Sequence, residues 1–119
     1  MISIVDTKIE DVKIIIPQIF SDNRGYFFES YNEDQFVQKI GKVNFIQDNE
    51  SKSTFGVLRG LHYQDEPNCQ SKLVRVIKGE IQDVAVDIRK ESKTYLEYIS
   101  VNLSSKNKKQ LYIPKGFVH

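Results

Sequence analysis

Residues 72–88 read Lys72-Leu-Val-Arg-Val-Ile-Lys-Gly-Glu-Ile-Gln-Asp-Val-Ala-Val-Asp-Ile88. Apolar and polar residues alternate on both sides of Gly79-Glu80, a pattern that predicts two strands joined by a two-residue type II′ turn. Counting back from that turn puts Lys72 opposite Asp87. One face of the hairpin would then carry a lysine and two acids among apolar groups: Lys72, Val74, Val76, Ile81, Asp83, Ala85 and Asp87. We therefore expect a sheet interior in which carboxylates balance the charge of Lys72.

Period-two patterns separated by turn residues recur through most of the chain. They predict further strands at residues 9–16, 26–31, 43–47, 56–64, 95–103 and 110–113. One short helix is expected after Asn32, which is placed to cap it, with Gln35 as its capping-box partner and Gly41 as its terminator. Many short strands with one minor helix favour an antiparallel sandwich or barrel over an α/β sheet.

The composition limits the class of protein. The 17 Lys and Arg residues nearly balance the 16 Asp and Glu residues, for a formal net charge of +1, which disfavours a nucleic-acid or membrane-surface binder. No apolar run approaches the roughly 18 residues of a membrane span, and the first residues do not resemble a signal peptide. The single cysteine, Cys69, cannot form an internal disulfide. We expect a single domain over residues 1–119, located in the cytoplasm.

Both histidines lie in settings that suit catalysis. In the segment Gly56-Val-Leu-Arg-Gly-Leu-His-Tyr-Gln64, Arg59 would suit an anionic substrate and His62 a proton transfer, if Gly60 marks a bulge that aims both at one cavity. The alternative is a hydrogen-bonded sheet histidine and an arginine at the rim, and the same alternative holds for His119. No metal is expected, because His62 has only a weak ligand two residues on. Carboxylates near Cys69 would raise its thiol pKa, so we interpret it as incidental.

Two further segments carry groups that suit a nucleotide. Phe20-Ser-Asp-Asn-Arg-Gly-Tyr-Phe-Phe-Glu29 places aromatic rings beside the guanidinium of Arg24, and Gln47-Asp-Asn-Glu-Ser51 adds amide donors and acceptors. A base needs a stacking surface and partners for its edge, and a diphosphate needs guanidinium. Each segment alone is typical of a turn or a solvated loop, so only the combination favours nucleotide binding.

These segments, taken in order with three others, closely resemble the dTDP-4-dehydrorhamnose 3,5-epimerase family. The resemblance covers essentially the whole chain and rests on residues 20–29, 47–51, 56–64, Lys72-Leu-Val-Arg-Val, Asp83-Val-Ala-Val-Asp-Ile-Arg89 and Ile113-Pro-Lys-Gly-Phe-Val-His119. It implies an all-β, cupin-type double-stranded β-helix (jelly roll) with one short helix, which agrees with the strand pattern. It also implies a homodimer in which the N-terminal region serves the neighbouring subunit's site.

The resemblance implies an isomerase that acts on a dTDP-sugar without a cofactor. The substrate would be dTDP-4-dehydro-6-deoxy-D-glucose, epimerised at C3 and C5 through enolates to dTDP-4-dehydro-L-rhamnose. His62 matches the general base, Lys72 the group that stabilises the enolate oxygen, and Asp83 a carboxylate beside that lysine. The substrate-binding residues it implies are Arg24, Arg59 and His119 for the diphosphate and sugar, and Phe20, Glu29, Gln47 and Asn49 for the thymidine.

The chain departs from the family at its end. The family continues past Gly116-Phe-Val-His119 with further strands, a tyrosine that acts as general acid and an aspartate that orients the base. We therefore expect a C-terminally truncated jelly roll without its closing strands, and impaired turnover unless these residues are a fragment of a longer chain. The alternatives are a non-catalytic dTDP-sugar-binding or dimer-forming protein, an epimerase of a single carbon, and a metal-dependent cupin oxygenase.

Overall fold

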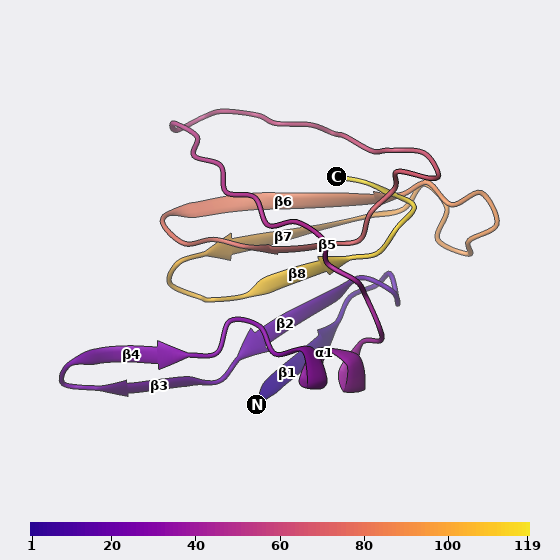
Figure 1. The fold of residues 1–119 in the computed structure, drawn as a ribbon. Coiled ribbons are helices and arrows are strands. Elements are labelled where there is room, and N and C mark those ends of the chain that lie inside the picture. Colours follow the sequence, from indigo (N-terminus) through magenta and orange to yellow (C-terminus); the bar gives the residue numbers. More distant parts are fainter.

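A computed structural model describes all residues, 1–119, and contains nine strands and one helix. The strands form three sheets: a four-stranded sheet in the order β1-β2-β8-β5, a three-stranded sheet in the order β7-β6-β9, and the β3-β4 hairpin, which stands apart from both in Figure 1. All paired strands are antiparallel. The elements are β1 (Ile2–Asp6), β2 (Lys13–Pro17), β3 (Ile19–Asp22), β4 (Gly25–Phe28), α1 (Glu33–Lys39), β5 (Lys72–Arg75), β6 (Glu80–Asp87), β7 (Tyr98–Ser104), β8 (Gln110–Ile113) and β9 (Phe117–Val118).

The two larger sheets pack on a shared apolar core. Its fully buried members come from both sheets and from the turn between β1 and β2: Ile9, Val12, Ala85, Ile99, Leu103, Leu111, Ile113 and Phe117. Val74 on β5 and Val101 on β7 are half-buried against it. Because side chains alternate along a strand, each sheet supplies every second residue to this core.

All four residues of β8 are buried, because both faces of its sheet are covered. Leu111 and Ile113 face the shared core, whereas Tyr112 belongs to a second cluster with Ile15 and with Phe36 of α1. The Phe36 ring meets the Tyr112 ring edge to face, with centroids 5.4 Å apart. The helix therefore closes the outer face of the four-stranded sheet.

The prediction of the helix is confirmed. Its N-cap is Asn32, whose side-chain oxygen accepts a hydrogen bond from the Gln35 backbone N–H at 3.0 Å. Gln35 does not close the capping box, because its side chain accepts instead from the Ile2 backbone N–H. The Asn32 cap therefore sets the start of the helix as predicted. The Gln35 side chain, the expected second capping group, bonds a strand residue instead.

The predicted hairpin of residues 72–88 is wrong. β5 pairs with β8, whereas β6 pairs with β7 over seven residue pairs and with β9 over two. Residues 76–79 therefore carry the chain from one sheet to the other. The alternation did identify the inward residues, since Val74 and Ala85 contact the same core from opposite sheets. Alternation specifies which side chains point inward but not which strand edge supplies the backbone partners.

The strands predicted at residues 43–47 and 56–64 do not form, and the chain from Gly41 to Ser71 contains no helix or strand. The second of these stretches makes one reciprocal backbone pair with the end of the chain, between His62 and His119, which follows β9. The predicted strands at 9–16, 26–31 and 95–103 are displaced to β2, β4 and β7, and β1, β3 and β9 were not predicted. A strand needs a partner edge, which a local pattern does not supply.

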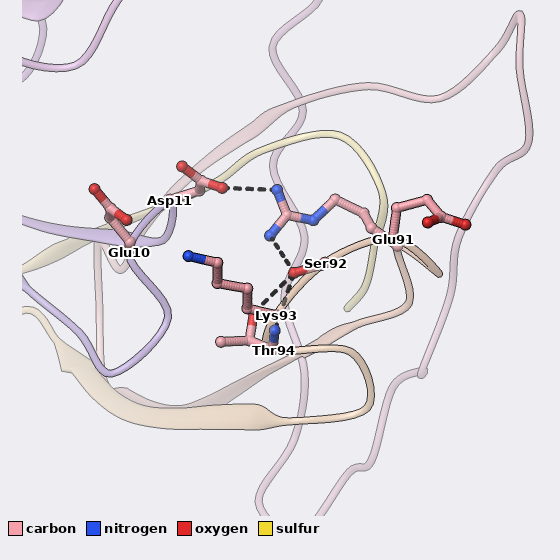
Figure 2. Close-up of a pocket in the computed structure, with 7 residues that line it drawn as sticks. Glu10, Asp11, Glu91, Ser92, Lys93 and Thr94 are labelled. Carbon is pink, nitrogen blue, oxygen red and sulfur yellow. Dashed lines mark hydrogen bonds and ion pairs between the residues drawn. The ribbon is translucent and has the colours of Figure 1, made fainter.

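The connection between β6 and β7 is organised by Asp87, whose side chain is fully buried. Its carboxylate accepts hydrogen bonds from the Arg89 guanidinium (2.9 Å to each oxygen), from Ser92 Oγ (2.6 Å) and from Thr94 Oγ1 (2.5 Å). Arg89 also pairs with Asp11 of the β1-β2 turn at 2.7 Å, and Figure 2 shows Asp11 and Ser92 approaching this guanidinium. Burial alone would raise the pKa of Asp87, but these hydrogen bonds lower it well below its usual range.

Leu111→Ala tests the shared core. The side chain is fully buried, so its truncation is expected to lower the free energy of unfolding by about 2–5 kcal/mol in urea denaturation. The matched control is Leu58→Ala, since Leu58 is 90% exposed and its truncation is expected to change that free energy by less than about 0.5 kcal/mol. Equal losses in the two variants would contradict the assignment of Leu111 to the core.

Acid titration of stability tests the Asp87 network. Because the folded-state pKa of Asp87 is lowered, its contribution is fully present above the unfolded-state value of about 3.9 and is lost as the pH falls below it. Between the lowered folded-state pKa and the unfolded-state pKa, the free energy of unfolding is expected to fall by up to about 1.4 kcal/mol per pH unit. Asp87→Asn is expected to be less stable at pH 7 and to show a shallower fall between pH 4 and pH 2. Glu91→Gln, at an exposed neighbour, should keep the wild-type slope; a wild-type slope in Asp87→Asn would exclude this role.

Candidate functional site

Lys72, His119 and Asp83 form a chain of contacts at one end of the two sheets. Lys72 begins β5 in one sheet, Asp83 lies on β6 in the other, and His119 follows β9. The Lys72 Nζ lies 3.5 Å from His119 Nδ1, and His119 Nε2 is hydrogen-bonded to Asp83 Oδ1. The Asp83 carboxylate can only accept a hydrogen bond, so it favours a proton on His119 Nε2. The Lys72 ammonium can only donate, so it favours an unprotonated Nδ1. The lone pair on Nδ1 then accepts from Lys72.

Asp83 is the buried end of this chain. Its side chain is only 5% exposed, and its second carboxylate oxygen, Oδ2, has no hydrogen-bond partner. An unpaired buried oxygen costs about 1–3 kcal/mol, so it is seldom left in place without a use. The interior between the sheets therefore holds the Asp83 carboxylate, the His119 imidazole and the half-buried Lys72 side chain in sequence.

His62 is held beside this chain by its backbone. Its N–H donates to the His119 carbonyl at 2.6 Å, and the His119 N–H donates to the His62 carbonyl at 2.9 Å. Gly60 has a φ of +97°, and a Cβ there would lie 3.0 Å from the His119 carbonyl oxygen. The expected strand bulge at Gly60 is therefore wrong, since no strand forms. The glycine is needed instead for the close approach of these two backbones.

A hollow of about 350 Å³ lies in front of these residues, lined among others by His62, Gln64, Cys69, Gln70 and Lys72. A hydrogen bond with Glu66 raises the pKa of the Cys69 thiol, which confirms the prediction that nearby carboxylates act in this direction. The thiol is therefore a poor nucleophile near neutral pH. The imidazole of His62 and the ammonium of Lys72 are the reactive groups that share this hollow.

Three further predicted residues lie on the irregular segment of residues 41–71. Gln47 donates to the Gln70 side chain at 3.0 Å, which joins it to the lining of the hollow. Arg59 is exposed, and its guanidinium donates to Ser53 Oγ at 2.8 Å and to the Lys52 carbonyl at 3.2 Å. Asn49 is also exposed. Of these three residues, only Gln47 contacts a residue that lines the hollow.

The last three predicted residues are not brought to this site within the chain. Phe20 and Arg24 lie on the β3-β4 hairpin, which projects away from the C-terminal end in Figure 1. The Arg24 guanidinium pairs with Asp22 at 2.6 Å, which raises the pKa of Arg24 above its usual value. Glu29 accepts from the Gln35 side chain at 3.2 Å, near α1.

Six residues that line the hollow were not among the predicted site residues: Tyr63, Gln64, Cys69, Gln70, Gly116 and Phe117. Gln70 lines the hollow, but residues 65–71 have no period that could have marked it. Gly116 lies directly before β9 with a φ of +89°, and the Pro114-Lys-Gly116 turn was the available signal. No group of three or more His, Cys, Asp or Glu side chains is arranged to hold a metal ion. No helix has the length and apolar character needed to cross a membrane.

Comparisons with known proteins give the family. Residues 6–119 match the family model of dTDP-4-dehydrorhamnose 3,5-epimerase. The chain is 57% identical over 118 residues to the dTDP-4-dehydrorhamnose 3,5-epimerase of Shigella flexneri, a match that covers 98% of this chain and 65% of that protein. The chain therefore spans slightly less than two thirds of this relative's length.

Solved structures agree with this assignment. The dTDP-6-deoxy-D-glucose-3,5-epimerase of Legionella pneumophila, solved with dTDP-4-keto-L-rhamnose, superimposes with a TM-score of 0.96 at 48% identity, over 100% of this chain and 63% of that one. The dTDP-4-dehydrorhamnose 3,5-epimerase of Bacillus anthracis, solved with TDP and pyrophosphate, matches with a TM-score of 0.96 at 41% identity, over 100% and 69%. These matches confirm the cupin-type jelly roll. Six motifs, the fold and the family model agree, and the chain belongs to the dTDP-4-dehydrorhamnose 3,5-epimerase family.

Proposed function

We propose that this protein converts dTDP-4-dehydro-6-deoxy-D-glucose to dTDP-4-dehydro-L-rhamnose by epimerisation at C3 and C5. The observation that carries the proposal is that His62 and Lys72 line one hollow, with Lys72 contacted from behind by His119, which bonds Asp83. The reaction needs a base next to an acidic C–H and a positive charge next to the C4 oxygen. This pair of groups meets both needs.

His62 is the proposed base. The substrate ketone at C4 acidifies the hydrogens on C3 and C5, so that an imidazole removes one of them and an enolate forms. A proton then returns to the same carbon on its opposite face, and repetition at the second carbon completes the reaction. The substrate's own ketone makes a cofactor unnecessary. The resemblance to the family implies that a tyrosine returns the proton as the general acid.

Lys72 is the proposed stabiliser of the enolate oxygen. Its ammonium donates to the oxygen at C4, whose negative charge grows as the proton leaves. His119 was expected to help bind the diphosphate and sugar, but both of its ring nitrogens already have partners. We therefore assign it to holding Lys72, with Asp83 as the buried counter-charge.

The nucleotide would be held by the remaining predicted residues. Arg59 has N–H groups beyond the two that bond Ser53 and Lys52, and these suit the diphosphate. Gln47 and Asn49 suit the thymine edge. Because Phe20 and Arg24 lie on the projecting hairpin, we propose a homodimer in which this hairpin and Glu29 complete the neighbouring subunit's site. The activity is assigned to the cytoplasm, in keeping with the single free cysteine.

Solvent exchange tests the activity. The protein expressed from its complete gene is incubated with the 4-keto substrate in D₂O, and deuterium is expected at both C3 and C5 by mass spectrometry and NMR. His62→Ala should slow exchange by about 10²- to 10⁴-fold and Lys72→Met by about 10²- to 10³-fold. Lys78→Met, at an exposed lysine between β5 and β6, should leave the rate unchanged. Deuterium at one carbon alone would identify a single-carbon epimerase, and none at all would exclude the enzyme.

Arg59→Met tests nucleotide binding separately from chemistry. A hydrogen bond to a charged group is worth about 1.5–3 kcal/mol, so the Kd for dTDP is expected to rise about 10- to 100-fold in isothermal titration calorimetry. Arg75→Met is the matched control, since Arg75 is an exposed arginine at the end of β5, and its Kd should stay at the wild-type value. An unchanged Kd in Arg59→Met would remove Arg59 from the diphosphate site.

A further inference from the structure

The segment that carries His119 is weakly held by its own strand. β9 consists of only Phe117 and Val118, and it meets β6 through two residue pairs, Asp87 with Phe117 and Val86 with Val118. Two ladder pairs are too few to fix the direction of a side chain that follows them, because strand ends fray. The reciprocal backbone pair with His62 holds His119 itself, and a further contact holds the backbone just before it.

That contact is the side chain of Arg89. A Cβ built on Gly116 would lie 2.5 Å from Arg89 Cγ and 3.0 Å from Cδ, so the backbone of Gly116 lies directly against the arginine's aliphatic part. The guanidinium carbon lies 4.8 Å from the centroid of the Phe117 ring. The Ile88 N–H donates to the Gly116 carbonyl at 3.2 Å. Residues 116 and 117 are thus clamped between Arg89 and the end of β6.

Arg89 is itself fixed from two sides. Asp87 binds its guanidinium through both carboxylate oxygens, and Asp11 binds it at 2.7 Å from the β1-β2 turn. The hydrogen bond to Asp87 is the main reason why the pKa of Arg89 is raised above its usual value. A planar guanidinium with a fixed fork of donors holds one orientation, which a lysine ammonium does not.

We propose that Arg89 is a positioning residue for the reaction. By clamping Gly116 and Phe117, it keeps the His119 imidazole on Asp83 and its Nδ1 toward Lys72, and so fixes the ammonium that faces the enolate. Arg89 touches none of the reacting atoms in this scheme. The proposal rests on the proposed function for its catalytic meaning, while the geometric statement about His119 stands without it.

The experiment reads the His119 ring directly by NMR of the ¹⁵N-histidine-labelled protein without substrate. Wild type is expected to show the Nε2-protonated tautomer of His119, with a slowly exchanging Nε2 proton. Arg89→Met should keep the fold at 25 °C by circular dichroism while that proton exchanges about tenfold faster, equivalent to about 1.4 kcal/mol. Arg89→Lys should lie between the two, since it keeps the charge but loses the fork. Arg75→Met, an exposed arginine-to-methionine change, should match wild type.

An unchanged His119 signal in Arg89→Met, with only the melting temperature lowered, would overturn the proposal and leave Arg89 a purely structural role. Should Arg89→Met fail to fold, Gly116→Ala places a Cβ 2.5 Å from Arg89 Cγ at a φ of +89° and so forces Gly116 and the Arg89 side chain apart. This variant should give the same faster exchange, and an unchanged signal would again overturn the proposal. In the deuterium assay, Arg89→Met should lower kcat with KM unchanged. Absence of turnover in wild type would exclude the enzyme while the NMR result still decides the role of Arg89.

Discussion

The packing of two sheets on one apolar core is the constraint on which the site depends. Lys72 belongs to one sheet and Asp83 to the other, so their distance is set by how closely Val74 and Ala85 approach the same core from opposite sides. His119 spans the remaining gap with both ring nitrogens engaged. Because protein cores are closely packed, the distance between the two sheets can vary little. Core packing therefore sets the distance between Lys72 and Asp83.

The site also shows how a charge is kept inside a small domain. An isolated ammonium in a half-buried place would lose part of its hydration, and the cost would favour its neutral form. Here the His119 imidazole contacts Lys72 through Nδ1 and the buried Asp83 carboxylate through Nε2. The arrangement keeps a positive charge facing the hollow, where a developing enolate needs it, because the counter-charge lies behind the ammonium rather than beside the substrate.

A second buried carboxylate, that of Asp87, orders a loop of the backbone and has no proposed part in the reaction. Asp87 gathers donors from Arg89, Ser92 and Thr94 and so orders the whole connection between β6 and β7. The same arginine reaches Asp11 in the N-terminal turn and lies against the residues just before His119. Two acids four residues apart on β6 therefore have different roles, since Asp83 contacts His119 behind Lys72 and Asp87 holds Arg89 against the residues before His119.

The features that could be predicted from the sequence alone are those set by residues close together in the chain and by the family motifs. The sequence determined the helix capped by Asn32, a turn within residues 21–25, the inward alternation around Val74 and Ala85, and the ordered motifs that identify the family. These follow from nearest-neighbour physics: a side-chain cap, a turn residue and a period of two are fixed by residues close in the chain.

Only the tertiary structure decided which strand edges meet. It placed β5 and β6 in different sheets, left residues 41–71 without strands, bonded His119 to Asp83 and made the β3-β4 hairpin project away from the C-terminal end. The reason is that backbone hydrogen bonds between strands are almost independent of side-chain identity, so a local pattern cannot choose among several available edges. The choice is made by burial of the whole core, which depends on all the sheets at once.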